Sequence, residues 1–287
     1  MKFVKMHSYG NDYVYVPLLD CDMDEPSAWA RFLSHRRFGV GSDGMVLICP
    51  SDVADFKMRI FNPDGSEAEM CGNALRSTGM LVYEKGYTDK TEFTVETLGG
   101  IKRIYLDVKN GRVDNITAAI GAPILEAEKV PVTVFDSKGH CLNVPVKVLD
   151  KTFYLNAISL GNPHCVVFVE DAFGFDIDKY GPAVECHPVL PKKANVEFVQ
   201  VLDEGNLRMR TWERNCGETL ACATGCSAAT VCGYLTGRCG PKTTVHQLGG
   251  DIDIRYDTKE NCIYMTGKSN IVFDGEADIN AYKEFVL

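Results

Sequence analysis

The 287-residue sequence repeats itself at a nearly fixed spacing, and this repeat constrains the fold more than any other feature. Similar segments recur 151 residues apart, and a short Leu-Gly-Gly segment recurs 150 residues apart. The recurring pairs are Tyr9–Asp12 with Leu160–Pro163, Met58–Phe61 with Met209–Trp212, Glu67 with Glu218, Cys71 with Cys222, Ala74–Ser77 with Gly225–Ala228, and Leu98–Gly100 with Leu248–Gly250. Matches that share one offset indicate an internal duplication and therefore two halves of similar fold.

Each half is predicted to mix strands and helices. Strands are expected where apolar residues alternate or where β-branched and aromatic residues gather. These segments are Lys2–Lys5, Tyr13–Leu18, Met45–Cys49, Phe56–Phe61, Phe93–Thr97, Lys102–Val108, Val113–Ala118, Val144–Leu149, Thr152–Ala157, His164–Val169, Val196–Leu202 and Leu207–Trp212. An amphipathic helix is expected over Ser27–Arg37, after a proline.

Two further helices are predicted over Gly72–Glu84 and Ala223–Leu235, where nearly all residues are small or apolar. A helix that is apolar on every side must be buried. We therefore expect an α/β (α+β) protein with two pseudo-symmetric domains, each a curved mixed β-sheet wrapped around a central buried helix. The expected domains are 1–119, completed by the C-terminal segment 268–287, and 120–267, with the active site in the cleft between them.

The sequence contains 12 cysteines, but their spacing does not indicate a metal site or a disulfide scaffold. There is no Cys-x-x-Cys, so no structural zinc is expected. The N-terminus lacks the apolar stretch of a secretory signal, which predicts a cytoplasmic protein with reduced thiols. Eight cysteines are expected to be small buried apolar residues. They are Cys21, Cys49, Cys141, Cys165, Cys186, Cys232, Cys239 and Cys262.

Charge and motif context argue against several classes of partner. The formal net charge is −9 and no basic block is present, so nucleic acid is not an expected partner. No apolar run reaches the roughly 18–20 residues that span a bilayer, so no membrane is expected either. Gly39–Gly44 matches the G-x-G-x-x-G pattern, but the expected helix precedes it and the expected strand follows it. Dinucleotide sites have the reverse order, so no nicotinamide or flavin is expected.

Cys71 and Cys222 each directly precede one of the two buried helices. A helix N-terminus binds carboxylates through its backbone N–H groups and lowers the pKa of a nearby thiol. Two such ends facing one α-carbon would place a thiolate base and a thiol acid on opposite sides of it. This arrangement suits proton removal from one face and proton delivery to the other, with inversion. No pyridoxal phosphate signature is present, and this chemistry requires no cofactor.

The segments around the two cysteines offer polar side chains at matching positions. Asn62 and Glu213 correspond at the 151-residue offset, so both are expected to point into the same cleft. Arg214 is suited to bind a second carboxylate through paired hydrogen bonds. Asn11 and Asn162 each follow a glycine in a duplicated loop, where an asparagine is also a common turn residue.

These motifs together resemble the diaminopimelate epimerase family along essentially the whole chain. The matching segments are Lys5–Asp12, Phe61–Ala74, Gly161–His164, Ala194–Val199, Glu213–Arg214, Gly217–Thr219 and Ala221–Cys222. The resemblance implies a cofactor-independent isomerase that interconverts LL- and meso-2,6-diaminopimelate, on the route to lysine and peptidoglycan precursors. It also implies a homodimer.

The resemblance implies a role for each candidate residue. Cys71 and Cys222 would be the acid–base pair, and His164 and Glu213 would tune their protonation. Gly72, Asn73, Ala223 and Thr224 would present backbone N–H groups to the reacting carboxylate. The distal end of the substrate would be bound by Asn62, Asn162, Asn195 and Arg214, and Asn11 would line the site.

The sequence departs from the family pattern at three positions and leaves other functions open. Gly44 stands where the family often has glutamine, Ala223 replaces the usual glycine, and Ser8 replaces a common glycine. Alternatives are a two-cysteine racemase for histidine or 4-hydroxyproline, a non-catalytic binding protein, and a thiol redox sensor. The set of Arg214 with Asn62, Asn162 and Asn195 favours diaminopimelate over histidine or 4-hydroxyproline, because its second ammonium-carboxylate end needs such partners. A binding protein would have no reason to have a cysteine at both helix starts.

Overall fold

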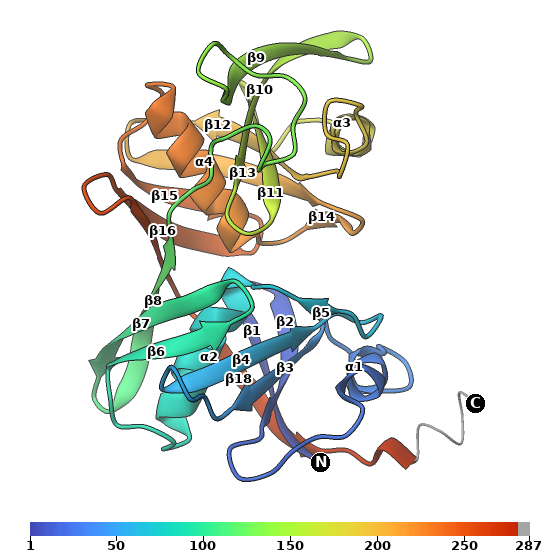
Figure 1. Cartoon of the computed structure of the whole chain (residues 1–287), viewed down its shortest axis with the longest axis vertical. Coiled ribbons are helices and arrows are strands. Elements are labelled where there is room, and N and C mark those ends of the chain that lie inside the picture. The colour runs from blue at the N-terminus through green and yellow to red at the C-terminus, as the bar shows by residue number, and fades with distance from the viewer. Residues whose placement is uncertain (281–287) are drawn as a thin grey trace. The chain divides into compact units, whose positions relative to one another are not determined.

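The computed structural model describes residues 1–280, which form two compact units (Figure 1). The first unit is Met1–Ala118 with residues 267–280, and the second is Ala119–Thr266. Residues 281–287, the last part of the predicted segment 268–287, lie outside the described residues. None of the described helices is long and apolar enough to span a membrane.

The first unit is a mixed sheet with two helices. Its strands are β1 (Lys2–Ser8), β2 (Asn11–Pro17), β3 (Met45–Cys49), β4 (Phe56–Phe61), β5 (Glu67–Ala68), β6 (Glu92–Thr97), β7 (Gly100–Lys109), β8 (Arg112–Gly121) and β18 (Asn270–Glu276). Its helices are α1 (Pro26–Ser34) and α2 (Gly72–Glu84). The β1 strand pairs antiparallel with β18 and β2, β2 pairs parallel with β3, β3 antiparallel with β4, and β4 parallel with β6.

The second unit repeats this order of elements, except that its outer strand comes first in the chain and not last. Its strands are β9 (Cys141–Val148), β10 (Lys151–Ser159), β11 (Pro163–Phe168), β12 (Asn195–Val201), β13 (Asn206–Glu213), β14 (Gly217–Thr219), β15 (Lys242–Gln247), β16 (Gly250–Asp257) and β17 (Cys262–Gly267). Its helices are α3 (Ile177–Glu185) and α4 (Ala223–Leu235). The β10 strand pairs antiparallel with β9 and β11, β11 pairs parallel with β12, β12 antiparallel with β13, and β13 parallel with β15.

The two units confirm the predicted fold class and the internal duplication. Helix α3 begins and ends 151 residues after α1, and α4 begins and ends 151 residues after α2. The parallel and antiparallel pairings also recur in the same sequence of strands. The β9 strand extends the second unit beside β10, as β18 extends the first unit beside β1.

The two central helices are buried because the sheet of each unit surrounds them. Helix α4 packs against β10, β11, β12, β13, β15 and β16, and every residue from Ala223 to Gly233 is buried. Helix α2 packs against β1, β2 and β7. A Cβ added to Gly79 of α2 would lie 2.8 Å from the Ile104 side chain, so this glycine permits the close approach of β7. Small residues therefore let the strands come close to each helix.

Two details of the prediction are wrong. Helix α1 ends at Ser34 and does not continue to Arg37, because the chain folds back and Gly41 donates its N–H to the Leu33 carbonyl. The expected burial of eight cysteines holds for four of them. Cys141, Cys165, Cys232 and Cys239 are buried, Cys49 and Cys262 are half-buried, and Cys21 and Cys186 are exposed.

Candidate active site

Cys71 and Cys222 are the N-cap residues of α2 and α4. Both have extended backbone, with φ of −135° and −129°, which turns the chain from a loop into the helix. The Cys71 sulfur accepts the N–H of Ala74 at 3.5 Å, and the Cys222 sulfur accepts the N–H of Gly225 at 3.3 Å. Each sulfur thus lies in the positive end of a helix dipole, which favours a thiolate.

In the first unit, three predicted site residues lie at the helix end that Cys71 caps. Asn11 Oδ1 is 3.7 Å from Cys71 Sγ and 3.2 Å from Asn73 Nδ2. Gly72 is the first residue of α2, so its backbone N–H belongs to the first turn, whose N–H groups have no acceptor in the preceding turn of the helix. The structure therefore brings Asn11, Cys71, Gly72 and Asn73 together at one helix end.

Tyr13 is a residue at this site that the sequence analysis missed. Burial raises the pKa of the Tyr13 phenol well above its ordinary value, and the neighbouring Cys71, to which the phenol is hydrogen-bonded, raises it further. The phenol therefore remains protonated beside the sulfur. The duplication could have indicated Tyr13, because it corresponds at the 151-residue offset to His164, which was a predicted site residue.

The position of Tyr13 also accounts for Gly44. A Cβ added to Gly44 would lie 2.8 Å from the Tyr13 ring and 2.4 Å from the Phe61 carbonyl oxygen. A side chain at position 44 therefore cannot be accommodated with Tyr13 in this place. The glutamine contact expected from the family pattern is absent, and the Tyr13 ring fills the space next to the backbone of Gly44.

In the second unit, polar and charged side chains surround Cys222. The Thr224 hydroxyl lies 3.5 Å from the sulfur, and the Gln247 side chain accepts the Cys222 N–H at 2.7 Å. Burial raises the pKa of the Cys222 thiol well above its usual range, and the negative charges of Glu213 and Glu197 raise it further. Thr224 and the Gly225 N–H act in the opposite direction but do not overcome these effects. The surroundings of Cys222 therefore favour its thiol form, although it lies at a helix N-terminus.

His164 and Glu197 form a fully buried pair next to Cys222. His164 Nδ1 lies 2.7 Å from Glu197 Oε1, and its Nε2 lies 3.0 Å from Asn162 Oδ1. A carboxylate oxygen only accepts, so Nδ1 carries a hydrogen. Glu197 was not among the predicted site residues. The sequence could have indicated Glu197, because it is the one charged residue in the apolar strand β12 (Asn195–Val201).

His164, Glu197 and Cys222 also form the one group of potential metal ligands within the described part of the chain. Their ligand atoms all lie within 4.8 Å of one another. Imidazole, carboxylate and thiolate are all zinc ligands. The 2.7 Å hydrogen bond between His164 and Glu197 would have to break for a metal to bind both residues.

The remaining predicted residues lie at the ends of neighbouring strands. Asn195 faces His164 in the parallel pairing of β11 and β12, and its Oδ1 accepts the Arg214 backbone N–H at 2.9 Å. The Arg214 residue is exposed. Glu213 accepts a hydrogen bond from the Thr219 hydroxyl at 2.7 Å. In the first unit, Asn62 donates to Ser66 in the loop after β4, so its observed contacts are to that loop and not to Cys71.

Known proteins resemble this chain in sequence and in structure. The sequence profile of the family described as Diaminopimelate epimerase matches residues 3–125 and 156–272. Diaminopimelate epimerases of Methanococcus maripaludis and Acetivibrio thermocellus are each 48% identical to it, over 97% and 98% of this chain and 100% and 99% of theirs.

The solved structures that resemble the chain are more distant in sequence. A phenazine biosynthesis protein of the PhzF family from Bacillus anthracis is 19% identical, with a TM-score of 0.68 over 97% of this chain and 99% of that one. A hydroxyproline epimerase of Agrobacterium vitis is 16% identical, with a TM-score of 0.65 over 96% and 91%. These likenesses show the fold, while the sequence matches show the family. The chain belongs to the diaminopimelate epimerase family of isomerases.

Proposed function

We propose that this chain interconverts LL- and meso-2,6-diaminopimelate with two cysteines and no cofactor. The observation that carries the proposal is the matched placement of Cys71 and Cys222 as N-caps of equivalent buried helices. In a family of epimerases, two such thiols supply an acid and a base for one α-carbon. The route to lysine and peptidoglycan precursors is the proposed setting for this reaction.

The proposed reaction moves one proton onto the α-carbon as another leaves. The Cys71 thiolate takes the α-proton, the electron pair stays on carbon, and the Cys222 thiol delivers its proton from the opposite face. In the reverse direction the two sulfurs exchange roles. The high pKa of Cys222 supports its assignment as the acid that starts protonated, because burial, Glu213 and Glu197 all favour its thiol.

The carboxylate next to the reacting carbon needs hydrogen-bond donors, because hydrogen bonds to it strengthen as negative charge develops on it. We propose that the backbone N–H groups of Gly72 and Asn73, with those of Ala223 and Thr224, bind this carboxylate. Each pair occupies the first turn of its helix, where the dipole favours an anion. Donors fixed in a helix require little rearrangement during the reaction.

The second amino-acid end of the substrate is assigned to the exposed Arg214 with Asn62, Asn162 and Asn195. Arginine binds a carboxylate through two parallel hydrogen bonds. The Asn195 side chain holds the backbone of Arg214 in place, which supports a role for this loop in recognition. His164 lies next to Cys222, and the negative charge of Glu213 raises the pKa of the Cys222 thiol. Both residues therefore suit a role in tuning the protonation of Cys222.

The oligomeric state and the cellular compartment of the protein are part of the same proposal. We infer a homodimer from the family resemblance, and we infer a cytoplasmic enzyme whose thiols stay reduced. Light scattering of the purified protein tests the first inference: a mass near twice 31.7 kDa supports it, and a mass near 31.7 kDa contradicts it.

The substrate is tested by chiral chromatography after incubation with LL-diaminopimelate, histidine and trans-4-hydroxyproline in parallel. The proposal predicts meso-diaminopimelate from the first and no change in the other two. Racemisation of histidine or epimerisation of hydroxyproline, with LL-diaminopimelate unchanged, would assign the protein to a different two-cysteine activity.

A further inference from the structure

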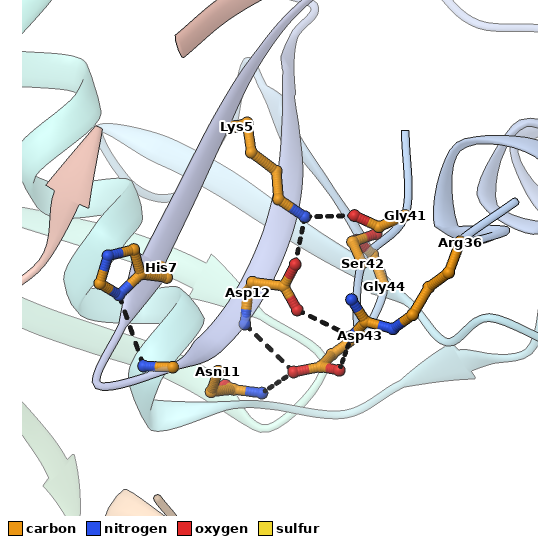
Figure 2. A network of polar contacts seen from close by, with 10 residues as sticks. Lys5, His7, Asn11, Asp12, Arg36, Gly41, Ser42, Asp43 and Gly44 are labelled. Atoms are coloured by element: carbon orange, nitrogen blue, oxygen red, sulfur yellow. Dashed lines mark hydrogen bonds and ion pairs between the residues drawn. The ribbon is translucent and has the colours of Figure 1, made fainter. Parts of the chain in front are cut away.

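The glycine-rich segment Gly39–Gly44 places a carboxylate near Cys71 in the first unit. The sequence analysis left this segment without a function. Figure 2 shows this carboxylate, Asp43, at the centre of a polar network. Asp43 Oδ2 accepts from Asn11 Nδ2 at 2.9 Å and from the Asp12 backbone N–H at 3.1 Å. Asp43 Oδ1 accepts from Arg36 at 2.8 Å. The loop therefore ends in a group that contacts Asn11 directly.

The position of Asp43 is held by the backbone on both sides of it. The Asp43 N–H donates to the Asp12 carbonyl at 2.8 Å, so the two residues bind each other through backbone and side chain. The Ser42 N–H donates to the Ser34 carbonyl at the end of α1. Lys5 contacts both Asp12 and the Gly41 carbonyl (Figure 2). The carboxylate is thus fixed before any substrate binds.

Asp43 determines which way the Asn11 amide points. An ionised carboxylate only accepts hydrogen bonds, so Asn11 must present its NH₂ group to Asp43. Its oxygen then points the other way, where Asn73 Nδ2 lies at 3.2 Å and Cys71 Sγ at 3.7 Å. The partners of an amide assign its oxygen and nitrogen.

The contact of Asn73 with Arg76 fixes the same orientation of the two amides from the other side. A guanidinium only donates, and Arg76 lies 2.6 Å from Asn73 Oδ1. Asn73 must therefore turn its NH₂ group toward Asn11, which in turn presents its oxygen. A buried donor at one end and a carboxylate at the other allow only one orientation of both amides.

We propose that Asp43 and Arg76 are positioning residues that orient the Asn73–Asn11 amide pair so that a carbonyl oxygen faces the Cys71 thiol. This inference rests on the proposed function and deepens it. When the Cys71 thiolate takes the α-proton, a new S–H bond forms and the carbon keeps the electron pair. The Asn11 oxygen accepts the hydrogen of this thiol, which stabilises the product of proton transfer.

The Asn11 oxygen favours the protonated form of Cys71, whereas other groups around the sulfur favour the thiolate. The helix N-terminus and the Ala74 N–H stabilise negative sulfur, and the hydroxyl of Tyr13 faces it as well. Cys71 raises the pKa values of both Tyr13 and Tyr15. A thiolate stabilised only by donors would be a weak base. An acceptor beside it raises the affinity of the sulfur for a proton.

Asp12 provides a matched control within the same network. Both aspartates bind Arg36, but the Asp12 carboxylate binds Lys5 and Arg36, whereas the acceptor of the Asn11 NH₂ group is Asp43. We expect Asp43→Ala to lower kcat about tenfold and to raise the rate of Cys71 alkylation by iodoacetamide several-fold, because Asn11 loses the acceptor for its NH₂ group and only the contact from Asn73 still opposes rotation of that group toward the thiolate. We expect Asp12→Ala to change both rates less than about twofold.

Peptide mass spectrometry separates the alkylation of Cys71 from that of the other cysteines. Buried Cys165 reports unfolding, because it becomes reactive only when the unit opens. A slower reaction combined with faster alkylation of Cys71 alone would support the proposal. Wild-type rates in a folded Asp43→Ala protein, or equal effects of the two aspartate variants, would overturn it. If Asp43→Ala does not fold, Asp43→Leu provides the same comparison, because its side chain has a similar shape and no acceptor for the Asn11 NH₂ group.

A double-mutant cycle separates positioning from general damage. In an Asn11→Ala background, Asp43→Ala should lower kcat by no more than about twofold further, because the group it orients is gone. Full additivity would contradict an action through Asn11. If the wild-type protein leaves diaminopimelate unconverted, the proposed function fails, while the alkylation of Cys71 still tests the orientation of Asn11.

Discussion

Cys71 and Cys222 occupy the same position in the two units, each capping a 13-residue buried helix, and they lie 151 residues apart in the sequence. Their surroundings differ. Cys71 is half-buried beside Asn11 and Tyr13, and Cys222 is buried beside Thr224 and near two carboxylates. The duplication therefore supplies two thiols, and the divergence around them gives each its own preference for a proton.

Removal of either thiol should abolish epimerisation. We expect Cys71→Ala and Cys222→Ala to lower kcat by at least about a thousandfold, because each direction needs both an acid and a base. Cys226→Ala is the matched control, since this buried cysteine lies one turn into α4. Turnover near the wild-type rate in either N-cap variant, measured by chiral chromatography, would exclude the two-thiol mechanism.

Arg214 should determine affinity for the distal end of the substrate. We expect Arg214→Leu to raise KM for diaminopimelate by roughly tenfold to a hundredfold through loss of a charge-assisted pair. Arg238→Leu serves as a control, because this exposed arginine of the same unit contacts Asn143 and the Phe168 ring instead. An unchanged saturation curve for Arg214→Leu would show that another group binds that end.

Gly44 should not tolerate the glutamine that the family pattern often has there. The Cβ would approach Phe61 O at 2.4 Å and the Tyr13 ring at 2.8 Å, so backbone or ring must move. We expect Gly44→Gln to lower the free energy of unfolding by about 2 kcal/mol, in the range of overpacked interiors. Urea unfolding measures this loss, and a wild-type midpoint would show that Tyr13 moves aside freely.

Asp55 should make stability depend on pH in acid. The Lys90 ammonium at 2.5 Å and the Thr94 N–H at 2.8 Å lower the pKa of Asp55 to about 2. Because the folded pKa lies below the unfolded value of 3.8, the stabilisation is complete above pH 3.8 and is lost as the pH falls through about 2.

The corresponding variant tests this pH dependence. Asp55→Asn should lower the free energy of unfolding by about 1 kcal/mol at pH 7, and the difference from wild type should shrink toward zero near pH 2. Asp52→Asn removes the same charge from the same loop as a control. A difference for Asp55→Asn that stays constant from pH 7 to pH 2 would contradict the assigned cause.

The sequence was informative where one physical pattern excluded alternatives. The bounds of α2 and α4 were predicted because small apolar residues on every face leave no solvent-exposed side. The reversed context of Gly39–Gly44 was also read correctly, since α1 precedes this segment and β3 follows it. In each case the local pattern and the fold impose the same requirement.

Other features depend on contacts that local patterns do not contain. Asp43 reaches Asn11 across 32 residues of sequence, through a loop whose path is set by α1 and β2. Burial of cysteine was mispredicted at Cys21 and Cys186 because a thiol is compatible with both the interior and the surface. Glu197 was missed because a charged residue in a strand is usually exposed, and only the pairing with His164 explains its burial.

The most direct test of the two-thiol account is incubation with LL-diaminopimelate in deuterated water. Proton removal by one sulfur and delivery by the other predicts meso product with one solvent deuterium at the inverted α-carbon, detected by mass spectrometry and proton NMR. Because a thiol exchanges its proton with solvent, the deuterium should be present from the first turnover. Meso product that retains its original α-hydrogen would contradict the mechanism.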